Sequence, residues 1–283
     1  MKECILYKPY KGKVQCLACA NKCVISDGKT GLCGVRKNLK NKLYLLVYGK
    51  PVAVHVDPIE KKPLYHFLPN TKTFSFGTVG CNFKCKFCQN ADISQEKTIM
   101  GQKYTVKKIV ELALESGCKS ISYTYNEPTI FIEFVKDVAE LAHKNGLKNI
   151  LVTNGYFTKK SLDFIAPYID AMNIDLKSFS NDFYLKHSGT KLKPVLDSIK
   201  RVHKKGIHIE LTTLLIPGEN DSKKELENIA KFIASVDKNI PWHISRFFPM
   251  YKMLNKSPTE LQSLKEAEKI GKKYLKYVYL GNI

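Results

Sequence analysis

The chain has 283 residues, of which 44% are hydrophobic, enough to bury the core of one large domain or two smaller ones. No apolar run is long enough to cross a membrane and the first residues lack the apolar core of a signal peptide, so we expect a cytoplasmic protein without a membrane partner. The formal net charge of +20 is compatible with RNA or with an acidic protein partner, although a scattered, lysine-rich surface set by genome composition also explains it.

The first 70 residues differ from the rest of the chain. They contain a CxxCxxxC pattern followed by one more thiol, formed by Cys16, Cys19, Cys23 and Cys33. In a chain without an export signal, this spacing indicates a metal site rather than disulfides. A structural zinc site and a fully ligated iron–sulfur cluster both fit four thiolates, and the sequence leaves the two open. Two β-like runs follow, at 42–49 and 51–56.

From residue 73 onward, strand-like and helix-like segments alternate. Strands are expected at 73–79, 119–125, 148–153, 170–176, 207–216 and 242–248. Amphipathic helices are expected at 105–117, 129–145, 158–167, 193–205, 222–236 and 258–275. Repeated strand–helix units predict parallel strands with right-handed crossovers, and about six of them suit an open, TIM-like (β/α)6 partial barrel. Ligands of such barrels bind at the carboxyl ends of the strands.

The most informative stretch follows the first of these strands, where Cys81, Cys85 and Cys88 are spaced CxxxCxxC. Three thiolates on one loop can hold three irons of a [4Fe–4S] cube and leave the fourth iron open to a substrate or cofactor. Phe87, between the last two cysteines, offers an aromatic face to an adenine. The alternatives are a zinc loop and the redox cluster of an electron carrier.

This loop resembles the signature loop of the radical S-adenosylmethionine (radical SAM) superfamily, in which SAM chelates the open iron through its amino and carboxylate groups. The next strand ends in Tyr125-Asn126-Glu127-Pro128, which resembles the Gly-Gly-Glu-Pro of most members. The resemblance implies that this backbone accepts hydrogen bonds from the SAM ammonium and that Asn126 and Glu127 belong to the cofactor site. Asn tolerates left-handed backbone, so we expect the turn to persist at Asn126.

Later strand ends carry further candidates for the cofactor site. Asn154 is similar to the Thr-Asn-Gly asparagine of activating enzymes, and the resemblance implies that it holds a polar group of SAM. Alternation along a strand puts Asp175 and Lys177 on one face, pointing into the barrel, where they can pair with each other and with the zwitterionic end of SAM. His243 resembles a late-strand histidine near SAM. An ordinary turn, a structural ion pair and a core histidine are the respective alternatives. Val152 replaces an expected aspartate, so we expect no monovalent cation site.

Over most of its length the chain is similar to one subgroup, the AmmeMemoRadiSam-system radical SAM proteins, which resemble pyruvate-formate-lyase-activating enzymes. The resemblance implies a Cys-rich extension with a β-arm at 1–70 and a radical SAM core barrel at 71–283. It also implies reductive cleavage of SAM to a 5′-deoxyadenosyl radical that abstracts hydrogen from a substrate, with a glycyl-radical-activase-like reaction on a protein or small molecule as the first candidate. The expected reductant is a flavodoxin or ferredoxin. An RNA-modifying radical SAM enzyme, favoured by charge, and a non-catalytic iron–sulfur electron carrier are the alternatives.

Overall fold

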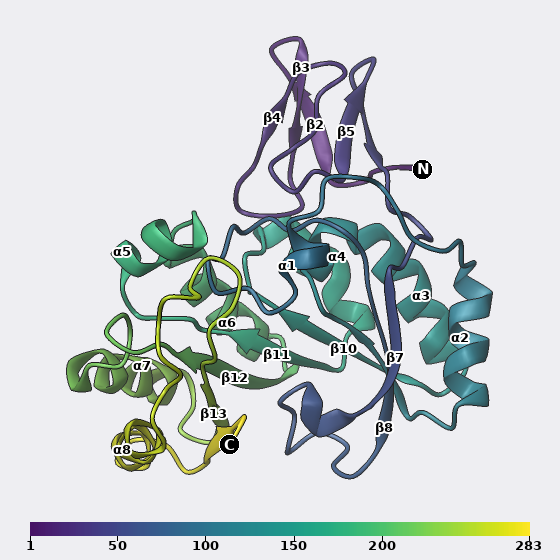
Figure 1. Cartoon of the computed structure of the whole chain (residues 1–283). Helices are drawn as coiled ribbons and strands as arrows, with labels where there is room; N and C mark the ends of the chain where they lie inside the picture. The colour runs from purple at the N-terminus through teal and green to yellow at the C-terminus, as the bar shows by residue number, and fades with distance from the viewer.

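An eight-stranded sheet forms the centre of the molecule (Figure 1), and the computed structural model describes all residues, 1–283. The strand order is β14-β13-β12-β11-β10-β9-β8-β7. Every neighbouring pair from β8 to β14 is parallel, and β7 is antiparallel to β8. The strands are β7 (Ala53–Pro58), β8 (Lys72–Gly77), β9 (Ser120–Tyr123), β10 (Lys148–Thr153), β11 (Ala171–Asp175), β12 (His208–Leu215), β13 (Trp242–Arg246) and β14 (Val278–Gly281).

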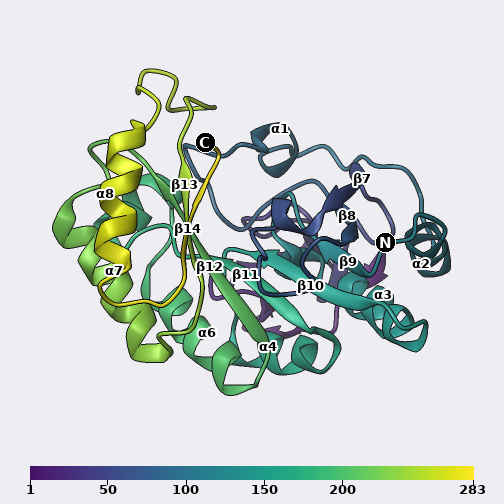
Figure 2. The ribbon, with the colours of Figure 1, turned by 90° about the horizontal axis from the view of Figure 1, so that it is seen from below.

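Six helices cover the outer face of this sheet, as Figure 2 shows. Polar side chains fix several of their starts: Thr105, Thr158 and Ser222 each accept a hydrogen bond from a backbone N–H of the first turn. None of the helices combines the length and the apolar character needed to cross a membrane. The six helices are α2 (Val106–Glu115), α3 (Ile132–Lys144), α4 (Lys159–Ile165), α6 (Lys193–Lys204), α7 (Lys223–Val236) and α8 (Leu261–Gly271).

The predicted fold class is confirmed. All six expected strands form, with bounds shifted by a few residues, and the expected helices follow them around the sheet. Because β7 and β14 do not pair with each other, the barrel is open between them. β14 was not expected, and it adds a seventh parallel strand at the edge. The strands between the edges are buried on both faces, as covering helices on one side and barrel contents on the other require.

Short helices and turns complete the strand connections. The predicted helix over 129–145 begins as a 3-10 turn at 128–131. Two short α-helices, at 91–94 and 181–183, lie near the strand ends and were not indicated by the sequence pattern. These elements are η1 (Ile59–Lys61), α1 (Ala91–Ser94), η2 (Pro128–Phe131), η3 (Ala166–Tyr168), α5 (Asn181–Phe183) and the π-helix η4 (Tyr184–Ser188).

The N-terminal residues form two small sheets that project from the barrel in Figure 1, with strand orders β1-β6-β5 and β2-β3-β4. The run expected at 42–49 contains β6, whereas the run expected at 51–56 becomes β7 and joins the main sheet. The division of the chain at residue 70 stays a prediction. The strands are β1 (Lys2–Glu3), β2 (Tyr7–Tyr10), β3 (Lys13–Cys16), β4 (Val24–Ile25), β5 (Arg36–Leu39) and β6 (Lys42–Leu45).

A buried ion pair fastens this extension to the barrel. The guanidinium of Arg36, on β5, pairs with the carboxylate of Glu133 on α3, and the two side chains are 2% and 1% exposed. Arg36 Nε also donates to the carbonyl oxygen of Ile130 at 2.8 Å. Guanidinium and carboxylate therefore satisfy each other where neither reaches water, as buried charges require.

Candidate active site

The loop with the three closely spaced cysteines, residues 78–90, follows β8 and is held at its start by one side chain. The Asn126 side chain accepts a hydrogen bond from Thr78 N–H (3.2 Å) and donates to Thr78 Oγ1 (3.1 Å) and to the carbonyl oxygen of Gly80 (2.8 Å). Asn126 was predicted as a cofactor-binding residue. In the structure it fixes the strand-to-loop junction, and direct contact with SAM stays a prediction.

The π-helix η4 holds the middle of the loop. Lys84 N–H donates to the Ser188 carbonyl and Lys86 N–H to the His187 carbonyl, each at 2.9 Å. π-Helical turns are rare and often occur at functional sites. Here the turn presents successive carbonyl groups to the loop, so a segment about a hundred residues away in the chain sets the position of the cysteines.

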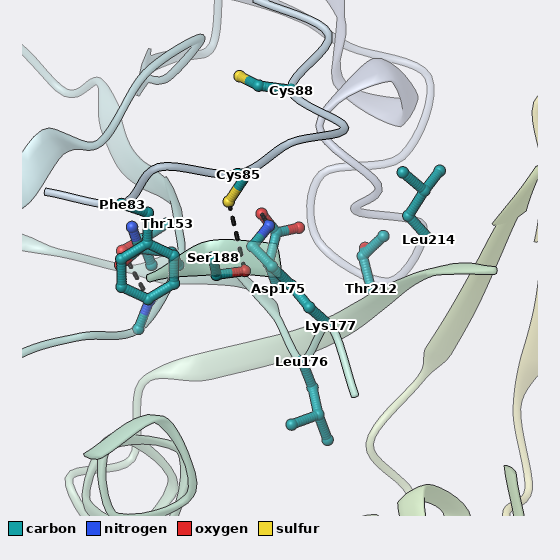
Figure 3. Close-up of polar contacts among 12 residues, drawn as sticks. Phe83, Cys85, Cys88, Thr153, Asp175, Leu176, Lys177, Ser188, Thr212 and Leu214 are labelled. Atoms are coloured by element: carbon teal, nitrogen blue, oxygen red, sulfur yellow. Dashed lines mark hydrogen bonds and ion pairs between the residues drawn. The ribbon is translucent and has the colours of Figure 1, made fainter. Parts of the chain in front are cut away.

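Two of the three loop thiols lie beside serine hydroxyls. Cys85 Sγ lies 3.5 Å from Ser188 Oγ and Cys88 Sγ lies 3.1 Å from Ser94 Oγ. Figure 3 shows Cys85 among the strand-end residues and Cys88 apart from them. No three Cys, His, Asp or Glu side chains are arranged to hold a single metal ion. In a [4Fe–4S] cube each thiolate binds a different iron around one centre, and a loop that supplies three thiolates leaves the fourth iron open.

Burial and charge shape the chemistry of these thiols. Burial raises the pKa of Cys81 and of Cys85, and for Cys85 the ammonium of Lys177 acts in the opposite direction. Iron binding must therefore supply the charge that stabilises the thiolates. The serine hydroxyls beside Cys85 and Cys88 are suited to donate to cluster-bound sulfur, an interaction that tunes iron–sulfur clusters.

An ion pair at the carboxyl end of β11 lies beside Cys85. Lys177 Nζ is 2.8 Å from Asp175 Oδ2, and the two side chains are 13% and 34% exposed. Figure 3 shows both residues next to the Cys85 sulfur. Burial opposes the charge on Lys177, but Asp175 and Cys85 outweigh it and raise its pKa. Lys177 Nζ also lies 5.6 Å from the centre of the Phe87 ring. Charge, thiol and aromatic face thus meet at one strand end, and the role of these residues in binding SAM stays a prediction.

Glu127 and Asn154 link two neighbouring strand ends to the loop. The buried Glu127 carboxylate accepts hydrogen bonds from Thr129 N–H (2.9 Å), Thr153 Oγ1 (2.8 Å) and Asn154 N–H (2.8 Å). Burial raises its pKa, and these donors act against that rise. Asn154 Nδ2 donates to Asn82 Oδ1 in the loop at 2.8 Å. These residues hold the loop against β10, and their contact with SAM stays a prediction.

The turn after β9 differs from expectation in one respect. Left-handed backbone occurs at Tyr125, with φ of 67°, and not at Asn126. A tyrosine is costly in that conformation, by roughly 1–2 kcal/mol. Two contacts hold it there: its hydroxyl donates to Asp57 Oδ2 at 2.7 Å, and its carbonyl accepts from Asn90 Nδ2 at 2.8 Å. The Asn126 side chain is thereby freed to anchor the loop.

A family model described as the radical SAM superfamily matches residues 76–233, which include the three loop cysteines and the strand ends described above. The chain belongs to the radical SAM superfamily. An uncharacterized protein of Methanocaldococcus jannaschii is 41% identical over all of this radical SAM chain and 86% of its own length. A protein of the same archaeon, provisionally named a glycyl-radical enzyme activating enzyme, is 30% identical over 71% of this chain and 77% of its own. The pyruvate formate-lyase-activating enzyme of Clostridium pasteurianum is 24% identical over 70% and 87%.

Solved radical SAM structures share the fold. A radical SAM methyltransferase from Sphaerobacter thermophilus matches with a TM-score of 0.60 and 16% identity, over 76% of this chain and 67% of its own. A domain of pyruvate-formate lyase-activating enzyme from Bacteroides vulgatus matches with a TM-score of 0.51 and 20% identity, over 58% and 99%. At these identities the likeness concerns the fold alone, and membership of the family implies a [4Fe–4S] cluster and SAM.

His243, another predicted cofactor residue of this radical SAM chain, lies in a different cluster from the residues described above. His243 Nε2 lies 2.6 Å from Glu210 Oε2, and the Glu210 carboxylate accepts hydrogen bonds from Tyr65 N–H at Oε2 (3.0 Å) and from His66 N–H at Oε1 (2.8 Å). Glu210 is the third residue of β12, so this cluster lies toward the amino ends of the strands, where the segment 62–67 crosses the barrel (Figure 1). The contact between His243 and SAM stays a prediction.

Sequence reasoning did not find several residues of the site. Ser188 and Asn82 carry no recognisable motif, and Glu210 is one acidic residue inside an otherwise ordinary strand. Cys4 belongs to neither cysteine pattern, yet it is buried near Cys16 and shares its charged neighbours Arg36 and Glu133. No local pattern could have indicated these positions, because their partners come from distant parts of the chain.

Proposed function

We propose that the chain is a radical SAM enzyme that binds SAM at the loop of Cys81, Cys85 and Cys88 and acts on a substrate in the manner of an activating enzyme. One observation carries the proposal: the half-buried ion pair of Asp175 and Lys177 at the β11 end, beside Cys85. When bound, cluster and SAM supply the chemistry: one electron cleaves the sulfonium bond, giving methionine and a 5′-deoxyadenosyl radical that abstracts hydrogen from the substrate.

The chain's own residues would bind and orient the cofactor. Lys177 would attract the carboxylate of SAM and Asp175 its ammonium, so that an existing ion pair opens to receive a zwitterion without leaving either charge unpaired. Phe87 is 4% exposed and packs against Phe183 with ring centres 5.9 Å apart, so its face is held firmly for an adenine. The hydrogen bonds that anchor the loop keep its position fixed and water excluded while the reactive species exists.

The names of two relatives support an activating-enzyme-like reaction, in which the hydrogen comes from a protein backbone or a small molecule. An electron source is also required, and a flavodoxin or ferredoxin fits a chain with a formal net charge of +20, because an acidic reductant is attracted to a basic surface. The cluster that the loop cysteines would hold is the acceptor of that electron.

The first experiment measures 5′-deoxyadenosine by chromatography after anaerobic iron reconstitution, reduction with dithionite and addition of SAM. We expect product from the unaltered chain and none from Cys85→Ala. Cys118→Ala is the matched control, because Cys118 is also a buried thiol, follows α2 and belongs to neither cysteine set. Equal product from both variants would contradict the assignment of the loop.

The net charge also favours a second candidate, an RNA-modifying radical SAM enzyme. If several lysines contact phosphates, the logarithm of the RNA binding constant should fall steeply and linearly with the logarithm of the salt concentration. A filter-binding titration between about 50 and 200 mM salt tests this alternative. Binding too weak to measure at the lower salt concentration would favour a protein or small-molecule substrate.

A further inference from the structure

Four cysteine thiols of the N-terminal extension line a single cavity. They come from the end of β3, the turns that follow it and the segment before β5, and all are free thiols. Three are buried and the fourth is partly buried. Packing does not require four thiols from separate segments to share one space, whereas a metal site with four thiolate ligands does. The cavity wall includes Cys16, Cys19, Cys23 and Cys33 together with Arg36 and Asn82.

Two kinds of metal site take four thiolates, a zinc ion and a [4Fe–4S] cube. A tetrahedral zinc ion lies about 2.3 Å from each thiolate and so holds the sulfurs about 3.8 Å apart. The four thiols line one cavity, as thiolates around a common centre must. The loop of Cys81, Cys85 and Cys88 belongs to a family that carries a cube there. A cube spreads its four thiolates over separate irons around one centre, and the other groups of the cavity wall favour it over a single ion.

The cavity wall supplies a second, independent observation. The side-chain nitrogen of Asn82 is buried and has no hydrogen-bond partner, while its side-chain oxygen accepts from Asn154 Nδ2 at 2.8 Å. A buried N–H without a partner costs about 1–3 kcal/mol. N–H donors to sulfur are common around iron–sulfur clusters, and a cluster in this cavity would give Asn82 its missing acceptor. Asn21 Nδ2 donates to the Asn82 carbonyl at 3.0 Å and fixes the residue against the extension.

Electrostatics in the cavity wall agree with an anionic ligand. Arg36 lines the cavity and is 1% exposed. A cube with four thiolates is negatively charged, and a guanidinium nearby offsets the cost of burying that charge. Glu133 partly balances Arg36, so the cation is kept in place whether or not the cavity is filled.

We propose that Cys16, Cys19, Cys23 and Cys33 hold a second [4Fe–4S] cluster, with a thiolate on every iron. Full thiolate ligation leaves no iron open to SAM, so this cluster is limited to electron transfer. Asn82 lines its cavity and directly follows Cys81 in the chain, so the second cluster adjoins the radical SAM loop. The site does not depend on the proposed SAM reaction.

The test counts metal and sulfide per chain after anaerobic reconstitution and desalting. We expect about eight irons and eight sulfides in the unaltered chain, and about four of each in the loop variant C81A/C85A/C88A and in the extension variant C16A/C19A. Cys118→Ala should keep about eight. In the reduced loop variant, the EPR signal of the remaining cluster should not change when SAM is added, because no iron is open.

The loop variant decides the outcome even where C16A/C19A fails to fold, since its extension is intact. Retention of about four irons with no response to SAM supports the second cluster. A loop variant without iron but with about one zinc per chain would overturn it in favour of a structural zinc site. A loop variant with neither metal would overturn any metal site in the extension. Loss of SAM cleavage in the loop variant tests only the proposed SAM site, whereas its metal content tests only the second cluster, so either proposal can fail without the other.

Discussion

Replacing Arg36 with methionine tests whether a buried ion pair holds the extension on the barrel. The substitution leaves the Glu133 carboxylate, which is 1% exposed, without its cation, and it leaves the Ile130 carbonyl without its 2.8 Å donor. Breaking a buried pair by removing one partner costs about 3–5 kcal/mol. Glu133 keeps one donor, Ile5 N–H at 3.1 Å, so we expect a loss of about 3–4 kcal/mol in the free energy of unfolding.

The double variant R36M/E133L separates charge burial from packing. It removes both charges and leaves only the Ile130 carbonyl and the Ile5 N–H unpaired. Ile5 is 58% exposed, so its N–H can find water. We therefore expect the double variant to lose only about 1–2 kcal/mol, less than Arg36→Met alone. Lys193→Met is the matched control, because the Lys193–Asp197 pair has side chains 81% and 34% exposed and should change stability by less than about 0.5 kcal/mol.

The assay is urea unfolding under anaerobic conditions, followed by far-ultraviolet circular dichroism, with stability read from the midpoint at an unchanged slope. The order of the three variants is the decisive result. An Arg36→Met loss below about 1 kcal/mol would show that the pair is solvated and not buried. A double variant at least as unstable as Arg36→Met would show that packing, and not the unpaired charge, explains the loss.

Three further predictions concern the barrel. Burial opposes ionisation of Glu210, but hydrogen bonds from His208 and His243 and from two backbone N–H groups outweigh it and hold its pKa at about 2. The lowered pKa contributes about 3 kcal/mol to stability above the unfolded pKa of about 4.3, and this contribution is lost as pH falls toward 2. Urea midpoints should therefore fall with pH across that window in the unaltered chain and change less in Glu210→Gln. An equal dependence of the midpoint on pH in both proteins would contradict this prediction. Lys177→Met should weaken SAM binding and lower 5′-deoxyadenosine formation at least about 10-fold at unchanged iron content, a loss of about 1.4 kcal/mol, and normal SAM affinity would remove Lys177 from the site. Asn126→Ala removes three hydrogen bonds at the loop junction, so iron should be lost faster to a chelator, and an unchanged rate would mean that η4 alone holds the loop.

The sequence predicted the barrel well because its signals are local. Alternating apolar strands and amphipathic helices repeat at the length of a strand–helix unit, and parallel strands place their carboxyl ends together whatever the details. For that reason Asp175 and Lys177 could be assigned to one face, and the structure brings them beside Cys85. Strands β1 to β5 and the edge strand β14 were not expected, whereas β6 lies in the run predicted at 42–49, since strands of two to four residues carry too little periodicity to be recognised on their own.

The left-handed residue of the β9 turn was assigned incorrectly, and the reason is tertiary. Intrinsic preference favours Asn126 over a tyrosine in that conformation. Tyr125 adopts it because Asp57 and Asn90 hold its hydroxyl and carbonyl, and both partners come from other strands and loops. Contacts worth a few kcal/mol outweigh a backbone preference of 1–2 kcal/mol, roughly speaking, and no window of sequence contains them.

The sequence by itself determined the class of chemistry, because three thiols on one loop with one position left open define a cluster that can bind a cofactor wherever the loop lies. Only the tertiary structure decided what surrounds that loop. It brought η4 against the middle of the loop and Asn126 against its start, and it placed Asn82 in the wall of the N-terminal thiol cavity. Spacing along the chain determines which cysteines can bind the same cluster. Burial, hydrogen-bond partners and the approach of a second cysteine set depend instead on contacts between residues far apart in sequence.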